Sequence, residues 1–395
     1  MSGARFEMAL HGLRSASRRR LLLALAGGLG ADPADAAVAE AMADEKRDEV
    51  HRGRRLQFPL DHGAHLGSRT EWWYVTGWFG QAEAPSHGLQ LTFFRHRTGL
   101  AAGLPGRLAP RQLLFAHAAI TELDPRGGGR HRHAERIMRW NGEIAAPGEL
   151  QAAGATTGDA RVWIADWHLQ RQGERWQASA RAAAASPPWA LRMTLRPTQP
   201  PLLQGEQGYS RKGPREDEAS LYLSLPQLAL QATLESDGRR VESSGRAWLD
   251  HEWSESLLAP EAVGWDWIGI NLFDGRALTA FQIRRADGSA LWAGGSLRAS
   301  KAETAQSFAP EDLRWTPERR WRSAATGADY PVDWRLLTPA GALRVRALLD
   351  AQELDARRST GTIYWEGLSE LLDEGGRRLG LGYLEMTGYA GRMRL

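Results

Sequence analysis

The sequence contains no cysteine in 395 residues, and only three of its 50 basic residues are lysine. The absence of cysteine excludes disulfides, thiolate metal sites, a cysteine nucleophile and a lipid-modified cysteine. After residue 36, no stretch reaches the roughly 18 uncharged apolar residues of a membrane-spanning helix. Neither a G-x-S-x-G elbow, nor a P-loop, nor a convincing dinucleotide fingerprint occurs. An α/β-hydrolase mechanism is therefore disfavoured, and no cofactor is expected.

An excess of charge of either sign is also missing. The 50 basic and 47 acidic residues give a formal net charge of +3, and residues 1–36 alone hold five arginines and three acids. Without that segment the chain is close to neutral, and it has no basic block beyond residues 52–55. A nucleic-acid partner is not expected, because nucleic-acid-binding proteins concentrate positive charge on one face.

The N-terminus has the pattern of an export signal. Residues 18–20 are arginines, and they precede an apolar run of about ten residues, which is too short to span a bilayer. Paired arginines before such a run are typical of twin-arginine export, and residues 34–36 supply an A-x-A cleavage site. We predict a signal at 1–36, a linker or short exposed helix at 37–54, and a periplasmic or secreted protein. The alternative is an amphipathic helix at a soluble N-terminus.

The rest of the chain is divided by Gly, Pro and Asp into short apolar segments, several with strand-like alternation. Asp-Gly steps at 237–238, 274–275 and 287–288 are typical of hairpin turns. The predicted strands are 72–79, 89–95, 113–121, 161–170, 189–196, 221–225, 228–235, 245–249, 265–273, 278–284, 291–298, 332–337, 343–348, 362–365 and 382–389.

This pattern predicts an all-β chain that forms two antiparallel barrels or sandwiches. Two domains are expected, because single cores stop growing near roughly 250–300 residues. We place them at residues 55–240 and 241–395. Helical periodicity is weak and is best at 313–322 and 369–374.

Nine dense motifs follow one another along the chain. They are FPLDHGAH (58–65), EWWYVTG (71–77), QLTFFR (90–95), FAHAA (115–119), GYSRKG (208–213), AWLDHEWS (247–254), GWDW (264–267), YWEG (364–367) and GYLEMTGY (382–389). In this order they resemble the AttH-like family of predicted secreted hydrolases, which is related to carotenoid 1,2-hydratases. The resemblance spans about residues 56–391 and implies two tandem lipocalin-like (calycin) β-barrel domains.

The resemblance implies two kinds of activity. The hydratases of the family add water across a terminal double bond of acyclic carotenoids, whereas most members are called secreted hydrolases without a demonstrated substrate. This chain resembles the secreted branch, because the hydratase branch tends to carry Asn in place of Glu252 and Tyr in place of Trp248. A hydrophobic isoprenoid or lipid-like ligand is implied, and some members sit beside exporter genes, which suggests an exporter partner.

Asp250 matches the acid proposed for the hydratases of this family. A carboxylic acid can protonate an alkene carbon if an apolar site keeps it protonated near neutral pH. His251 or Glu252 would position or deprotonate the water, and indole rings would stabilise the carbocation. The indoles expected to bind substrate here are those of Trp248, Trp253, Trp265 and Trp267. The alternative is that Asp250 and Glu252 cap a turn or bind arginine, with the tryptophans as core.

Other motifs supply further candidates for substrate binding. Because side chains alternate along a strand, residues 71 and 73 would face one side and residues 72 and 74 the other. Glu71 beside Arg95 or Arg97 predicts a structural ion pair, with a pocket role as the alternative. The remaining predicted substrate-binding residues are Trp72, Trp73, Tyr74, His117, Tyr209 and Lys212.

A metal site is the other possibility for the histidines. The candidate ligands are Asp61, His62, His65 and His117. In an extended chain, positions 62 and 65 point to opposite faces, so a turn would be needed to bring them together. Hydrogen-bonded histidines within a fold are more common than ligands, and we predict no metal.

Two functions of different classes fit these residues. The first is an exported enzyme that hydrates or hydrolyses a hydrophobic substrate by acid catalysis with Asp250. The second is a non-catalytic periplasmic lipid carrier that works with an ABC-type exporter, because barrels that enclose apolar ligands serve either purpose. Asp250 buried in a continuous apolar tunnel favours the enzyme. Asp250 paired with arginine at the surface, with a cavity elsewhere, favours the carrier.

Overall fold

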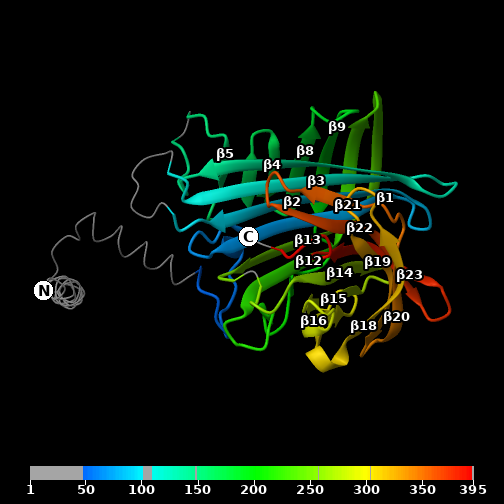
Figure 1. The fold of residues 1–395 in the computed structure, drawn as a ribbon. Coiled ribbons are helices and arrows are strands. Elements are labelled where there is room, and N and C mark those ends of the chain that lie inside the picture. Colours follow the sequence, from blue (N-terminus) through cyan, green and yellow to red (C-terminus); the bar gives the residue numbers. More distant parts are fainter. Residues whose placement is uncertain (1–47, 101–108, 147–148, 257, 303, 394–395) are drawn as a thin grey trace, which may run out of the picture. The chain divides into compact units, whose positions relative to one another are not determined.

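The strands of the chain form two antiparallel sheets that follow one another in the sequence (Figure 1). The computed structural model describes residues 48–100, 109–146, 149–256, 258–302 and 304–393. The predicted export signal and residues 37–47 of the predicted linker lie outside these residues. None of the helices within the described ranges has the length and hydropathy that a bilayer crossing requires.

The first sheet has thirteen strands and follows a short 3-10 helix, η1 (Leu60–His62). The strands are β1 (Thr70–Gly80), β2 (Pro85–Arg97), β3 (Gln112–Leu123), β4 (Gly129–Trp140), β5 (Ala153–Ala155), β6 (Arg161–Ile164), β7 (Trp167–Gln172), β8 (Arg175–Ala182), β9 (Trp189–Arg196), β10 (Leu202–Leu203), β11 (Tyr209–Arg211), β12 (Ala219–Ser236) and β13 (Arg239–Ser254). Their order is β4-β3-β2-β1-β13-β12-β9-β8-β7-β6-β5, with β10 and β11 paired to β12. The sheet curls until its ends meet, since Arg136 of β4 donates a hydrogen bond to the Ile164 carbonyl of β6.

The second sheet has ten strands, and a 3-10 helix, η2 (Pro310–Asp312), precedes its fifth. The strands are β14 (Gly264–Leu272), β15 (Ala277–Arg284), β16 (Ala290–Arg298), β17 (Gln306–Phe308), β18 (Arg314–Arg322), β19 (Asp329–Thr338), β20 (Gly341–Ala347), β21 (Glu353–Ala356), β22 (Thr362–Asp373) and β23 (Arg378–Met386). Their order is β17-β16-β15-β14-β23-β22-β20-β19-β18, with β21 paired to β22. These two curled sheets confirm the predicted all-β fold of two tandem lipocalin-like domains.

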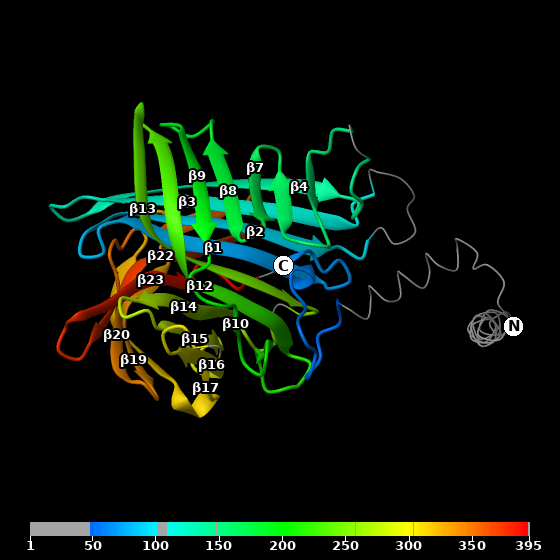
Figure 2. The same ribbon diagram turned by 180° about the vertical axis from the view of Figure 1, so that it is seen from behind.

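Alternation along the strands produces three large apolar cores, beside a small cluster of Ala119 with Leu354, Ala356 and Tyr364. One lies inside the first sheet and includes Trp73 and Leu249, and a second lies inside the second sheet and includes Ile268. The third joins the outward faces of the two sheets and includes Tyr74 of β1 and Trp267 of β14. Neighbouring residues of β1 therefore enter different cores, as the alternation of residues 71–74 predicts. Figure 2 shows β12 and β14 side by side where the sheets meet, as does Figure 1.

The hairpin of β12 and β13 fixes the register of the AWLDHEWS motif. Asp237 and Gly238 at its tip both have left-handed φ angles, 54° and 71°, which suit the tight turn that an Asp-Gly step predicts. The two predicted strands 221–225 and 228–235 are one strand, β12, with a register shift between Leu225 and Leu228. The shift arises because the proline at position 226 has no N–H to donate, and Gln227 adopts a left-handed φ of 57°.

Three sequence-based assignments differ from the structure: the division of the chain at 240/241 and the two weak helical segments. β13 pairs with β1 and β12, so the chain changes sheet between Ser254 and Gly264, and a division at 240/241 would cut the β12–β13 hairpin. The weak helical segments are strands, because 313–322 coincides with β18 and 369–374 begins within β22. In β18, Trp315 and Trp321 pack against the second core, and Pro317 disfavours a helix.

The end of the predicted linker is part of the first domain. The backbone N–H of Gly67 donates to Asp48 Oδ2 at 2.7 Å, and the Ser68 hydroxyl donates to the Asp48 carbonyl. Arg54 forms an ion pair with Asp61 at 2.7 Å, with both side chains buried. Residues 48–54 therefore pack on the protein and do not form a free linker.

Candidate active site

The AWLDHEWS motif lies in β13, and its side chains alternate between the two faces of the first sheet. Asp250 and Glu252 line a pocket on the outward face. His251 and Trp253 lie on the inward face, where the His251 ring stacks on Trp73 of the first core. The three predicted catalytic residues are thus not one group, because the sheet itself separates His251 from the other two. Trp73 and Trp253, predicted to bind substrate, are core residues instead.

The pocket lies where the outward faces of the two sheets meet. Strands β1, β2, β3, β12 and β13 supply one wall, and β14, β15, β22 and β23 supply the other. The aromatic lining includes Trp72, Tyr74, Tyr222, Trp265, Trp267 and Phe281. Of the predicted substrate-binding residues, four aromatic side chains are therefore on the pocket wall. The pocket is between the domains and not inside either curled sheet.

Asp250 is buried on the wall that the first sheet forms, with 3% of its surface exposed. Its Oδ2 accepts a hydrogen bond from the Tyr222 hydroxyl at 2.7 Å, and Oδ1 accepts one each from Ser224 and the Trp248 indole at 2.6 Å. Within the described part of the chain, no lysine or arginine pairs with it. Burial raises the pKa of Asp250 to about 7, although these hydrogen bonds act in the opposite direction. A large fraction of the molecules therefore carry a proton on Asp250 near neutral pH.

The second sheet reaches this carboxyl through one indole. Trp267 Nε1 of β14 donates to the Tyr222 hydroxyl at 3.1 Å, and that hydroxyl donates to Asp250. The Trp267 ring also meets the rings of Tyr74 and Trp248 edge to face. Trp248 thus acts as a hydrogen-bond donor behind Asp250, and the two domains share the acid's surroundings.

Glu252 lies on the same wall as Asp250, but a cation faces it. Lys212 Nζ is 2.9 Å from Glu252 Oε1 and lies over the Tyr222 and Phe281 rings, 4.6 and 4.4 Å from their centroids. The loop before β12 therefore brings Lys212 into the pocket, where the sequence predicts a contact with substrate. Tyr209 of the same region is not among the pocket residues, and its hydroxyl donates to a backbone carbonyl.

Two acids that sequence reasoning missed face the pocket from the second sheet. Glu366 of β22 and Glu385 of β23 lie directly opposite each other, and both line the pocket. Glu366 is 2% exposed, and its Oε1 has no hydrogen-bond partner among the described residues. Burial and the neighbouring Glu385 raise the pKa of Glu366 well above its ordinary value. Burial, with Asp250 and Glu252 nearby, raises the pKa of Glu385 to about 8.

His117 lines the pocket from β3, but both of its ring nitrogens are occupied. The Tyr364 hydroxyl lies 2.8 Å from Nδ1, and the Ser359 hydroxyl lies 2.8 Å from Nε2. Burial lowers the pKa of His117 to about 3, so the ring is neutral. His117 thus orients Tyr364, another pocket residue, and leaves no nitrogen free for a substrate or a metal.

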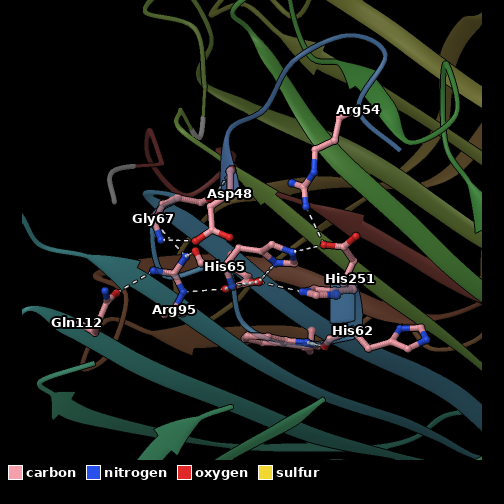
Figure 3. Close-up of polar contacts among 12 residues, drawn as sticks. Asp48, Arg54, His62, His65, Gly67, Arg95, Gln112 and His251 are labelled. Carbon is pink, nitrogen blue, oxygen red and sulfur yellow. Dashed lines mark hydrogen bonds and ion pairs between the residues drawn. The ribbon is translucent and has the colours of Figure 1, made fainter. Parts of the chain in front are cut away.

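On the inward face of β13, His251 belongs to a cluster of buried charged groups (Figure 3). Glu71 Oε1 lies 3.0 Å from His251 Nε2 and 2.8 Å from His65 Nδ1. Arg95 Nε donates to Glu71 Oε2 at 2.7 Å, which confirms the predicted ion pair, and both residues also border the pocket, as the alternative interpretation expects. Burial acts to raise the pKa of Glu71, but Arg95 and the two histidines hold it well below its ordinary value.

The same cluster is the one group of possible metal ligands that the described residues offer. Ligand atoms of His65, Glu71 and His251 lie within 4.8 Å of one another. These atoms are already engaged, because His65 Nε2 contacts Asp61 Oδ1 at 3.0 Å and Arg95 holds Glu71. The Arg95 guanidinium beside Glu71 would also repel a cation. The donor set fits an ion-pair network and does not fit a metal.

The metal-ligand set considered from the sequence is not assembled. Asp61 and His65 meet, but the His62 ring packs against Phe58 and Trp176, with centroids 4.5 and 5.3 Å apart. Burial lowers the pKa of His62 to about 3. Figure 3 shows the His62 ring apart from His65, Arg95 and His251.

Residues 49–389 match the AttH-like family. The chain belongs to this family. A candidate AttH from Nitrosomonas europaea is 41% identical to this AttH-like protein, with a TM-score of 0.74 over 86% of this chain and 99% of that chain. Kievitone hydratase from Nectria haematococca is 12% identical, with a TM-score of 0.62 over 85% and 94% of the two chains, and it shares the fold. No curated protein sequence matches this chain.

Proposed function

We propose that this AttH-like protein is a hydratase-type enzyme that adds water to a carbon–carbon double bond of a hydrophobic, isoprenoid substrate. One observation carries the proposal. Asp250 is buried in an aromatic pocket, receives only neutral hydrogen bonds, and has a pKa raised to about 7 by burial. That is the state in which a carboxylic acid can donate a proton at neutral pH. Kievitone hydratase, which has the same fold, is a hydratase by name.

In this reaction, Asp250 transfers its proton to one alkene carbon, and the positive charge develops on the other carbon. The aromatic walls would stabilise this cation, by up to about 2 kcal/mol for each desolvated ring face. Trp72 lies on one wall and Trp265 and Trp267 on the other, an arrangement that supports binding of a planar prenyl group. Water then adds to the cation and loses one proton, and a trisubstituted prenyl double bond gives a tertiary alcohol.

The hydrogen bonds to Asp250 suit the change in its charge. Donors that point at a carboxyl stabilise its ionised form, which appears as the proton leaves. The Tyr222 hydroxyl, Ser224 hydroxyl and Trp248 indole are in place before the reaction and need no rearrangement. Burial keeps the proton on Asp250 beforehand, and these donors lower the energy of its departure.

The test is conversion of a panel of acyclic isoprenoids (geraniol, farnesol, squalene and lycopene) by the purified protein. We expect a mass gain of one water for at least one of them, and a loss of about 100-fold or more for Asp250→Asn, as for removal of a general acid. Native mass spectrometry of the protein as purified runs in parallel. A lipid that co-purifies unchanged, with no conversion by the wild type, would support the carrier function instead.

Export is part of the proposal, whereas cooperation with an exporter belongs to the alternative carrier function. The paired arginines and the A-x-A site in residues 1–36 support a periplasmic or secreted location. We expect the full chain expressed in a bacterial host to appear in the periplasmic fraction. Arg18→Lys with Arg19→Lys should retain it in the cytoplasm, and an unchanged distribution would contradict twin-arginine export.

A further inference from the structure

The carboxyls that face the pocket differ in what holds them. Asp250 receives three hydrogen bonds, and Glu252 faces Lys212. Glu366 and Glu385 on the opposite wall have no cation partner among the described residues, and Glu366 Oε1 has no hydrogen-bond partner there either. A buried carboxyl oxygen without a partner is rare in proteins and indicates an atom that the protein itself does not supply.

Tyr74 brings a second unsatisfied atom to the same place. Tyr74 is 6% exposed, and its buried hydroxyl makes no hydrogen bond of normal length and angle within the described residues. The Glu366 carboxyl is close enough to interact with it as a hydrogen-bond acceptor. Burial raises the pKa of Tyr74, and the Glu366 carboxyl beside it raises the pKa further. Tyr74 belongs to the first sheet and Glu366 to the second, and the hydroxyl and the carboxyl approach each other between the sheets without forming a hydrogen bond of normal length and angle. A buried water that bridges them would satisfy both.

We propose that Tyr74, Glu366 and Glu385 form the site that binds the nucleophilic water, and that the Glu366–Glu385 pair accepts a proton from it. This inference rests on the proposed hydration. Two carboxyls side by side in an apolar site share one proton, because both cannot be ionised together. Such a pair offers one O–H donor and one carboxylate acceptor, the two groups that orient and deprotonate a water.

The proton and electron balance of the step is complete without a cofactor. The Asp250 O–H bond breaks and a C–H bond forms from the alkene electron pair. A lone pair of the water then forms the C–O bond to the cationic carbon. One O–H bond of that water breaks, and its proton passes to the carboxylate of the Glu366–Glu385 pair. The proton returns to Asp250 through the water that replaces the product, so alkene and water are the only reactants consumed.

The experiment separates the two half-reactions by running them in D₂O with a panel substrate that the wild type hydrates. Glu366→Gln and Glu385→Gln should each lose alcohol formation by about 100-fold or more, as for loss of a general base. Both variants should still exchange deuterium into the recovered alkene, because Asp250 remains. Asp250→Asn should lose both reactions. Alcohol formation at the wild-type rate in both glutamate variants would overturn the water site and leave the hydratase proposal standing.

Glu370 supplies the matched control. It lies four residues after Glu366 in β22 and is also 2% exposed, but Arg346 and Arg378 each lie 2.5 Å from its carboxyl. Glu370→Gln should therefore lower the melting temperature while the folded fraction forms alcohol at the wild-type rate. An equal loss of alcohol formation in Glu370→Gln would show that any buried glutamate of β22 matters, and would overturn the assignment.

A second measurement does not depend on turnover. A crystal structure of the wild type that resolves ordered waters should show one within hydrogen-bond distance of both Glu366 Oε1 and the Tyr74 hydroxyl. Tyr74→Phe should weaken or displace that water. A dry contact between the two residues in the wild type would overturn the water site even if no panel substrate is hydrated.

Discussion

The acids that lie on the two sides of β13 are in opposite charge states. On the inward face, Glu71 is held ionised by Arg95 and two histidines. On the outward face, Asp250 and Glu385 have raised pKa values and no cation partner within the described chain. Glu71 and Asp250 are buried to a similar degree, 1% and 3% exposed, so the difference between these two comes from their neighbours. A paired buried acid maintains the fold, whereas an unpaired buried acid at a pocket is available for proton transfer.

The largest loss of stability should follow from breaking the ion pair between Glu71 and Arg95 on the inward face. Arg95→Met removes the cation that pairs with Glu71. It also leaves three buried acceptors without their donor, namely Gln112 Oε1 and the carbonyl oxygens of His65 and Ser68. We expect a loss of about 3–5 kcal/mol in the free energy of unfolding, because an uncompensated charge stays buried. Urea-induced unfolding followed by Trp fluorescence measures it.

Arg97 is the control in the same strand. It is 44% exposed in its side chain and pairs with Glu255 at 3.2 Å on the surface. Arg97→Met should cost about 1 kcal/mol or less. Similar losses for Arg95→Met and Arg97→Met would contradict the contrast between the two regions.

The free energy of unfolding should depend on pH with opposite sign for the pocket acids and for the inward cluster around Glu71. A raised pKa means that the folded protein keeps a proton that the unfolded chain releases, so the free energy of unfolding falls as pH rises. For Glu385 this fall should run from about pH 4, the ordinary value of a glutamate, to about pH 8. For Glu71, whose pKa is lowered, stability should instead be lost as the pH falls.

Glu385→Gln tests this directly by unfolding measurements between pH 4 and 9. The variant should show a smaller decline than the wild type above pH 5 and the same loss of stability at acid pH. Parallel curves for the two proteins would mean that Glu385 titrates normally, and the pocket would then differ from the inward cluster in geometry alone.

The smallest effect on stability should come from Asp250→Asn. Asparagine keeps one acceptor oxygen for the donors around it, and no ion pair is broken, so we expect a change within about 1 kcal/mol. Asp333 is the comparison, because it is 1% exposed and accepts two hydrogen bonds from Arg344. Asp333→Asn should cost about 1.5–3 kcal/mol. Calorimetry of both variants at pH 6 measures which substitution lowers the free energy of unfolding more.

Strand alternation in the sequence predicts much of this arrangement. It places Tyr74 and Trp72 on the face opposite Glu71 and Trp73, and the structure agrees. The same rule separates His251 from Asp250, although the sequence interpretation grouped them by adjacency. Glu71 with Arg95 is also accessible from sequence, because a buried acid in a strand needs a basic partner nearby.

The water site is not accessible from the sequence alone. Glu366 and Glu385 each stand out as an acid among apolar residues in the YWEG and GYLEMTGY motifs, but their pairing depends on the register of β22 and β23. The position of the pocket depends on which outward faces of the two sheets meet, and no local pattern specifies this. Strand β4 was missed for a similar reason, since its charged side chains are only partly buried and show no apolar alternation.

Two hydrogen bonds link the domains at the acid: Trp267 donates to the Tyr222 hydroxyl, and that hydroxyl donates to Asp250. The Tyr222 hydroxyl that donates to the acid of the first domain thus accepts a hydrogen bond from an indole of the second. A substitution at position 267 in the second domain therefore also changes the surroundings of Asp250 in the first.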